Sequence, residues 1–204
     1  MDMPNTNPLT VTLDALNAKL DLLNEKCIVN HSCYFGATNN NYTEFDKLDK
    51  HRVCGIKLFM GSSTGNMLVD KMNSLLNIFN GTDMLIAAHC EDQETIKNNI
   101  EKYKQKYKGA DDIPVSAHPS IRSVPACYAS SELAVRLAKI AGARLHILHV
   151  STAKELQLFS DEPLASKNIT AEACVAHLLF TLTHYNSLGT RIKCNPAVKR
   201  KTDR

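Results

Sequence analysis

Short apolar runs rich in β-forming residues alternate with segments of helical periodicity along most of this chain of 204 residues. Such alternation is typical of βαβ units, in which helices connect parallel strands. The sequence therefore predicts an α/β fold built on a parallel sheet. The expected strands cover residues 27–33, 53–60, 84–89, 144–150, 169–174 and 191–194.

Apolar residues spaced three and four apart predict amphipathic helices between these strands. The helical stripes lie within residues 13–23, 68–79, 96–107 and 133–140. Thr152, with Glu155 three residues later, has the pattern of a capping box that opens a further helix. The stretch from Gly109 to Pro125 contains three prolines. We expect it to be a loop within a single domain that covers residues 1–204.

Composition excludes several classes of function. A hydrophobic content of 44% is enough for a sizeable core, and the formal net charge of +3 is spread along the chain, so no nucleic-acid surface is expected. Seven cysteines without a C-x-x-C pair predict reduced thiols. Because no leader-like segment or membrane-length apolar run is present in the sequence, we expect a cytoplasmic protein with no membrane partner.

One lysine, Lys57, stands inside an otherwise apolar run that continues into the small-residue loop 61–65. A buried lysine is costly unless it is paired, neutralised or chemically altered. Carboxylation by CO2 would turn its amine into an anion able to bridge two metal ions. His89 and His149 end two further apolar runs. Three such residues at the carboxyl ends of successive strands suggest a metal centre, because the loops there carry the chemistry of a (β/α) barrel.

Each of these residues also has a plain structural interpretation. Lys57 could be a salt-bridged core lysine. His89 and the two acidic residues close behind it could form a helix entry, where the helix dipole favours negative charge. His146 and His149 are three residues apart, so a strand would point them to opposite faces and only one could face a barrel interior. His146 is the one expected to face away.

The ordered motifs resemble the dihydroorotases, a family of the amidohydrolase superfamily that folds as a (β/α)8 TIM-type barrel. The D-M-P-N-T and N-P motifs favour this family over the hydantoinases and allantoinases. The seventh-strand pattern T-x-E-x-x-x-H-H-L is matched except for Ala176, which replaces its first histidine. The motifs are D-M-P-N-T at 2–6, G-I-K-L-F at 55–59, A-H-C-E-D at 88–92, L-H-I-L-H-V-S-T at 145–152, T-A-E at 170–172 with H-L at 177–178, and K-C-N-P at 193–196.

The resemblance implies a binuclear metal site, with zinc as the expected metal. Lys57 matches the carboxylated lysine that bridges the two metals, and His89 and His149 match the ligands of one of them. Glu172 is either a further ligand, a carboxylate that fixes a histidine tautomer, or a hydrogen-bonded core residue.

The resemblance also implies a substrate site and a reaction. Asn5 matches the asparagine that contacts the substrate carboxylate, and Asn195 matches the one that holds the pyrimidine ring. The implied enzyme interconverts dihydroorotate and N-carbamoyl-aspartate, a step of pyrimidine biosynthesis. A hydantoinase- or allantoinase-type hydrolase and a non-catalytic, amidohydrolase-like scaffold are the alternatives.

Two parts of the family pattern do not occur in the sequence. The H-x-H of the first barrel strand is expected before Met1, and the catalytic aspartate of the eighth strand is expected beyond Arg204. We therefore predict an incomplete barrel with about six of eight strands, inactive or nearly so on its own. A homo-oligomer is one option for its assembly.

Overall fold

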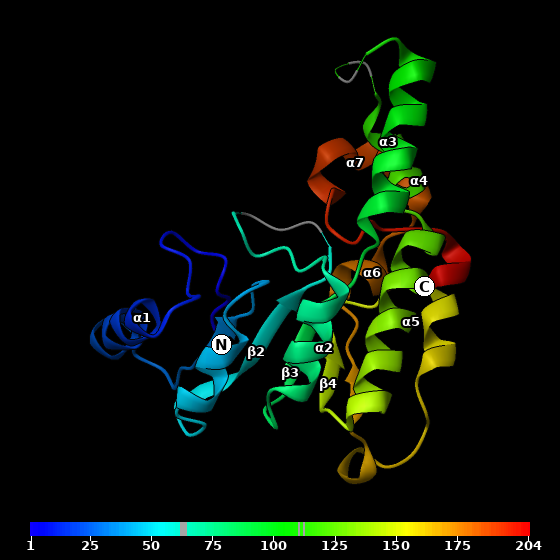
Figure 1. Ribbon diagram of the computed structural model, residues 1–204. Helices are drawn as coiled ribbons and strands as arrows, with labels where there is room; N and C mark the ends of the chain where they lie inside the picture. Colours follow the sequence, from blue (N-terminus) through cyan, green and yellow to red (C-terminus); the bar gives the residue numbers. More distant parts are fainter. Residues whose placement is uncertain (62–64, 110, 112) are drawn as a thin grey trace. The chain divides into compact units, whose positions relative to one another are not determined.

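The structure is a computed structural model that describes residues 1–61, 65–109, 111 and 113–204. Its strands form one five-stranded sheet in the order β1-β2-β3-β4-β5, and β2 pairs in parallel with both β1 and β3 (Figure 1). The predicted α/β class and incomplete TIM-type barrel are confirmed. The strands are β1 (Cys33–Gly36), β2 (Val53–Phe59), β3 (Ile86–His89), β4 (Leu145–Ile147) and β5 (Ile169–Ala171).

Four α-helices overlap the predicted stripes, but the second begins only at Met72, because Leu68 forms a β-bridge with Phe59. Polar side chains cap the starts of the first and third. Thr12 accepts a hydrogen bond from the backbone of Ala15 at the start of the first helix, and Asp92 does the same for Thr95 at the start of the third. The α-helices are α1 (Leu13–Lys26), α2 (Met72–Asn80), α3 (Gln93–Tyr107), α4 (His118–Ile121), α5 (Val124–Ala141), α6 (Val175–Leu179) and α7 (Tyr185–Leu188). Shorter 3-10 helices cover Tyr42–Lys47, Val115–Ala117, Ala153–Leu158, Leu164–Ser166, Leu182–His184, Gly189–Ile192 and Lys201–Asp203.

The chain divides into two compact units, each made of two segments of sequence. The first unit contains Met1–His89 and Ala134–His146, and the second contains Cys90–Leu133 and Ile147–Arg204.

The first unit is built around β1, β2 and β3. Ile56, Leu58 and Ile86 are fully buried, and Phe35 packs edge-on against Phe45 with ring centroids 6.1 Å apart. Burial on both faces explains why these strands read as nearly continuous apolar runs.

Gly55 lets β2 and β3 approach each other. Its φ is +156°, and a Cβ at this position would lie 2.4 Å from the carbonyl oxygen of Leu85. A side chain cannot be accommodated there without moving the backbone of the neighbouring segment.

The second unit has an apolar cluster of its own. Tyr185, Ile192 and Val198 are buried together, and Phe180 and Cys194 pack against them. This cluster lies directly beside the K-C-N-P segment, so its packing supports that loop.

Two of the six predicted strands are wrong as placed. Residues 27–32 are not a strand, since Ile28 is fully exposed and the pairing with Val53 begins only at Cys33. The predicted strand 191–194 overlaps a 3-10 helix, Gly189–Ile192. The apolar side chain of Ile192 belongs to the Tyr185 cluster instead of a sheet. At Ile192 tertiary packing outweighed β-forming composition, whereas Ile28 and Val29 are exposed and β-forming composition alone does not make a strand there.

Other boundaries also differ. The predicted strand 144–150 stops at Ile147, because the backbone turns left-handed at His149, where φ is 43°. The predicted loop from Gly109 to Pro125 contains one 3-10 turn and α4, and α5 begins within it at Val124. The loop residues 62–64 of the lysine run lie outside the described residues.

The predicted cap at Thr152 is present, although it opens a 3-10 helix and not an α-helix. Its hydroxyl accepts from the backbone of Glu155 at 3.2 Å and donates to the same residue's carboxylate at 2.8 Å. Ser131 donates to the other carboxylate oxygen at 2.6 Å. Glu155 is therefore a buried carboxylate held by two hydroxyl groups.

Candidate active site

Lys57 lies in β2 with only 2% of its surface exposed. Its Nζ donates to the carbonyl oxygen of Leu58 at 3.0 Å and lies 3.7 Å from the centroid of the Phe59 ring. A backbone carbonyl and the face of an aromatic ring both attract a positively polarised amine. The first unit thus buries a lysine amine beside a backbone carbonyl and an aromatic ring.

His89 is the last residue of β3 and is also buried. In the parallel register Lys57 is opposite Ala87 and Phe59 is opposite His89. Because side chains alternate along a strand and paired residues share a face, Lys57, Phe59 and His89 lie on one face of the sheet. The rings of Phe59 and His89 are 6.0 Å apart between centroids.

The side chains of Lys57 and His89 have chemistry that suits a metal site. A histidine nitrogen and a carboxylate oxygen, which a carboxylated lysine would supply, are both donors that zinc accepts. Within the ranges that the structure describes, no group of three or more histidine, cysteine, aspartate or glutamate residues forms a complete cation site.

His149 and Glu172 belong to the second unit, just beyond the ends of β4 and β5. The backbone of Glu172 donates to Ile147 at 3.1 Å and accepts from Val150 at 2.8 Å, so the chain segments that carry the two predicted ligands run side by side. The Glu172 side chain is exposed. His149 has left the strand, so strict alternation with His146 does not apply to it.

Asn5 lies exposed in a loop that Lys19 ties to α1. The Lys19 Nζ donates to the carboxylate of Asp2 at 2.8 Å, to the carbonyl of Met3 at 2.9 Å and to the hydroxyl of Thr6 at 2.9 Å. All three protons of the ammonium group are used, and the loop closes around it. Sequence reasoning missed Lys19, whose position in the middle of a helical stripe carried no signal of this role.

Asn195 is exposed on a loop whose next residues, from Pro196 to Lys199, are buried. The carbonyl of Cys194 is hydrogen-bonded by His118 at 2.8 Å, and that of Pro196 by His177 at 2.9 Å. The predicted substrate residue therefore projects from a firmly held piece of backbone.

Sequence reasoning did not find Arg122 and Lys199, two buried charged residues of the second unit. Arg122 forms an ion pair with Glu91, whose side chain is completely buried. Lys199 donates to Ser151 at 2.9 Å and to the thiol of Cys127 at 3.4 Å. Burial raises the pKa of the Cys127 thiol to about 11, although Lys199 opposes the shift, so this cysteine stays protonated. Its role in this environment is that of a packed core residue.

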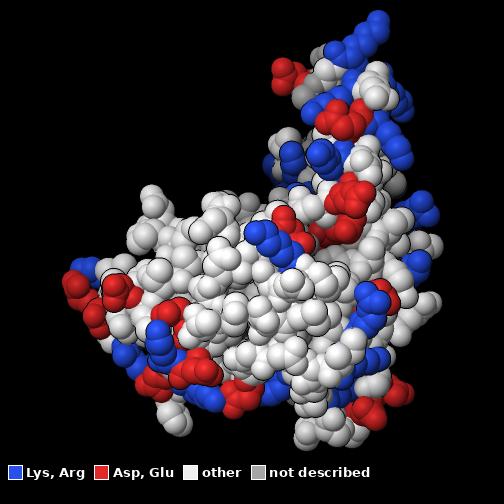
Figure 2. Space-filling view, viewed as in Figure 1, with Lys and Arg blue, Asp and Glu red and all other residues white. Residues whose placement is uncertain are grey.

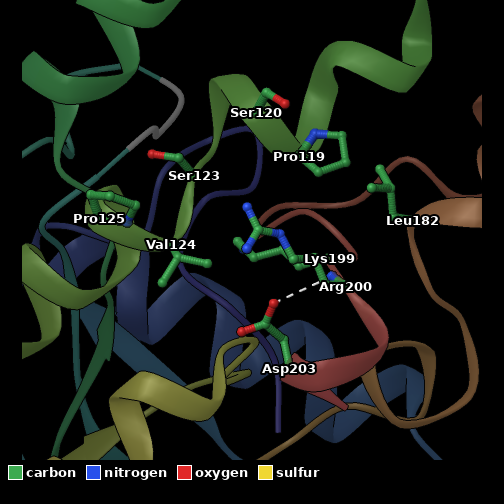
Figure 3. A pocket seen from close by; sticks show the side chains of 9 residues that line it. All are labelled: Pro119, Ser120, Ser123, Val124, Pro125, Leu182, Lys199, Arg200 and Asp203. Atoms are coloured by element: carbon green, nitrogen blue, oxygen red, sulfur yellow. Dashed lines mark hydrogen bonds between the residues drawn. The ribbon is translucent and has the colours of Figure 1, made fainter.

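A cavity of about 320 Å³ lies at the start of α5 in the second unit. Figure 3 shows the Arg200 side chain extending across it, with the backbone of Arg200 donating to Asp203 at 3.3 Å. Ser120 and Ser123 line the opposite side. Its lining belongs to the second unit and includes none of that unit's predicted site residues, His149, Glu172 and Asn195.

Charge on the visible face does not form a single-sign surface. Figure 2 shows lysine and arginine side chains interspersed with aspartate and glutamate, including along α3. None of the described helices is long and apolar enough to cross a membrane.

Comparison with solved structures supports a class of protein. L-hydantoinase (dihydropyrimidinase) from Arthrobacter aurescens matches 98% of this chain and 45% of its own, with a TM-score of 0.88 and 25% identity. A D-hydantoinase matches 95% of this chain and 43% of its own, with a TM-score of 0.80 and 19% identity. No protein-family model matches the chain.

Curated relatives fall in the same class. Dihydroorotase of Methanosphaera stadtmanae is 28% identical over 206 residues, covering 98% of this chain and 44% of the relative. Allantoinase of Escherichia coli is 26% identical over 212 residues, covering 98% and 45%. The chain thus spans less than half the length of the relatives that it matches. All of these proteins are cyclic amidohydrolases, and the similarity supports that class for this chain.

Proposed function

We propose that the chain is part of a metal-dependent cyclic amidohydrolase that interconverts dihydroorotate and N-carbamoyl-aspartate. The observation that carries the hydrolase proposal is a buried lysine amine and a histidine on one face of neighbouring parallel strands. The D-M-P-N-T and N-P motifs, together with the similarity to a dihydroorotase, support the choice of substrate.

Lys57 would take up CO2 through its neutral amine, forming a carbamate and releasing a proton. Lys57 and His89 are the proposed metal ligands of the first unit, and His149 and Glu172 are those predicted for the second. When bound, divalent metal ions supply a Lewis acid and an activated water. Zinc is the proposed metal.

The two asparagines would bind and orient the substrate. An asparagine amide donates two hydrogen bonds and accepts others, so it can recognise both a carboxylate and a ring imide. Asn5 is assigned to the substrate carboxylate, and Asn195 to the pyrimidine ring. Their proposed contribution is orientation, because a cyclic amide held in one pose presents a single carbonyl for attack.

A hydantoinase- or allantoinase-type activity is the second candidate, favoured by the hydantoinase fold match and the allantoinase relatives. Substrate profiling of the longest protein that contains this segment separates the two. We expect kcat/KM for L-dihydroorotate to exceed those for allantoin and hydantoin at least about 10-fold. A preference for either of the other substrates would overturn the dihydroorotase assignment, and metal-loaded protein that binds but turns over none of them would favour a scaffold.

Lys57 provides the sharpest test of the metal proposal. In that active protein, Lys57→Ala should lower kcat by orders of magnitude, and added short carboxylic acids should partly restore it. A free carboxylate can imitate a tethered one at an entropic disadvantage. Lys57→Arg should not restore activity, since a guanidinium group stays cationic.

Lys50→Ala is the matched control, because Lys50 is an exposed lysine paired with Asp83. It should retain normal activity. Near-normal turnover and metal content in both Lys57 variants would make Lys57 a structural residue.

A further inference from the structure

The exposed Asn195 is flanked by two backbone carbonyls that buried histidines hold from different elements. His118, the first residue of α4, approaches the carbonyl of Cys194 with its Nε2 at 2.8 Å. His177, within α6, approaches the carbonyl of Pro196 with its Nε2 at 2.9 Å. Each of these histidines has 8% of its surface exposed.

The two hydrogen bonds restrict the backbone on both sides of the Asn195 α-carbon. Fixing the carbonyl of Cys194 fixes the peptide plane that precedes Asn195. On the other side the proline ring limits φ at Pro196, and its carbonyl is fixed by His177. The direction in which the Asn195 side chain leaves the backbone is then largely determined.

Further contacts strengthen this arrangement. The Cys194 thiol also donates to the Pro196 carbonyl at 3.2 Å, and Lys199 donates to the carbonyl of Ala197 at 3.0 Å. Between Cys194 and Lys199, Asn195 is exposed, whereas Pro196, Ala197, Val198 and Lys199 are buried.

Neutral histidines suit this task. Burial lowers the pKa of both His118 and His177, although their hydrogen bonds to the backbone oppose the shift. A neutral imidazole that donates through Nε2 satisfies a carbonyl without placing a cation in the core.

We propose that His118 and His177 are positioning residues that clamp the backbone around Asn195 and thereby aim its amide at the substrate ring. The inference rests on the proposed role of Asn195 in substrate binding. A purely structural role would stabilise the unit without any coupling to Asn195, and the experiments below separate the two.

The first experiment needs no ligand. In the 204-residue protein, hydrogen exchange of the Asn195, Ala197 and Val198 amides is compared between wild type and His118→Leu or His177→Leu. Each leucine variant should speed exchange there at least about 10-fold, and each glutamine variant, which keeps an amide donor, should restore slow exchange.

His31→Leu serves as the matched control, because His31 also contacts a backbone carbonyl, that of Val29 at 3.1 Å, in the first unit. It should leave the loop amides unchanged. Unchanged exchange in both clamp variants would overturn the inference.

A measurement on the wild type covers the case in which leucine variants fail to fold. Nitrogen-15 NMR of the imidazoles should give both histidines as the neutral tautomer protonated at Nε2, with slowly exchanging protons. The Nδ1–H tautomer at both residues would contradict the clamp, because its Nε2 could not donate.

The second experiment uses L-dihydroorotate as the probe. Its dissociation constant is measured for wild type, His177→Leu, Asn195→Ala and the double variant. If the histidine acts through Asn195, the double variant binds no more weakly than Asn195→Ala alone. Additive losses would refute positioning. Absence of any effect of Asn195→Ala would instead remove Asn195 from substrate binding, leaving the clamp to be judged by amide exchange.

Discussion

At the scale of single residues, Arg122 and Glu91 form a buried ion pair in the second unit. Glu91 is completely buried, and 11% of the Arg122 side chain is exposed. Removing one member of a buried pair leaves the other charge in the core, which costs more than the pair itself contributes.

We predict that Arg122→Met lowers the free energy of unfolding by about 3–5 kcal/mol. Combining it with Glu91→Gln should recover part of that loss, because the carboxylate that faces Arg122 is then replaced by a neutral amide. Urea unfolding of the two single variants and the double variant measures both effects. Equal stability of wild type and Arg122→Met would mean that the carboxylate does not depend on the guanidinium.

The two clamp histidines make stability depend on pH. Both have a pKa below the ordinary 6.5 in the folded protein because burial disfavours the charged ring. At pH values between the folded pKa and the ordinary 6.5, the unfolded chain therefore binds more protons than the folded one. The contribution of these two histidines to the free energy of unfolding is fully present above about pH 6.5 and is lost as the pH decreases toward their folded pKa values. The charged groups around His118 are Arg122, Lys193 and Glu91, and those around His177 are Lys199, Glu155 and Glu91.

Urea unfolding between pH 5 and 8 tests this dependence. Each histidine contributes a slope of at most about 1.4 kcal/mol per pH unit. The variant His118→Gln/His177→Gln should have a shallower slope below pH 6.5. An identical slope in the variant would assign the acid sensitivity to other groups.

At the scale of elements, Lys19 joins α1 to the loop that carries Asn5. Three acceptors from Asp2, Met3 and Thr6 surround one ammonium group, and the Lys19 side chain is 11% exposed. Arginine cannot reproduce this geometry, because its planar group directs its donors differently.

We expect Lys19→Met to reduce stability by about 1–2 kcal/mol and to speed amide exchange in residues 2–6. Lys19→Arg should rescue little of either effect. Lys26→Met is the control, since Lys26 is exposed and pairs only with its neighbour Glu25 among the ion pairs that the structure describes. It should change stability by less than about 0.5 kcal/mol. Similar losses in the Lys19 and Lys26 variants would argue against an anchor.

The long helices were easier to predict than the ends of the strands, for physical reasons. A stripe such as Leu16 and Leu20 in α1 is a local pattern, and Thr12 marks where it starts. A short strand exists only where it pairs with a partner strand. Ile28 and Val29 therefore led to a wrong strand prediction, and the strand begins at Cys33, which pairs with Val53. Lys57 and His89 could be predicted because each ends or interrupts an apolar run. His118 could not be predicted, since its partner Cys194 lies far away in the sequence.

At the scale of the whole molecule, the length of the chain bears on its activity. It spans 44% of the related dihydroorotase and 45% of the allantoinase. Catalytic groups that act as a unit lose nearly all activity when part of the unit is missing.

We predict that the purified 204-residue protein, supplied with zinc and bicarbonate, converts L-dihydroorotate at least about 10³-fold more slowly than a longer protein containing the same segment. A coupled assay in both directions measures this. Substantial turnover by the 204-residue chain would show that its own residues complete the catalytic set.

The division of the chain into two units has a consequence for how it can be cut. Each unit combines an early and a late stretch of sequence, and the backbone of Ile86 donates to the carbonyl of Arg144 at 2.9 Å within the first unit. A single break after His89 would separate these partners and would also deprive the first unit of residues 134–146. No single cut, whether by gene fission, a protease nick or a one-point truncation, therefore yields the two units as two intact fragments: after His89, residues 90–204 keep the whole second unit but the first unit is divided. Dissecting this protein requires circular permutation or an internal excision with a bridging linker.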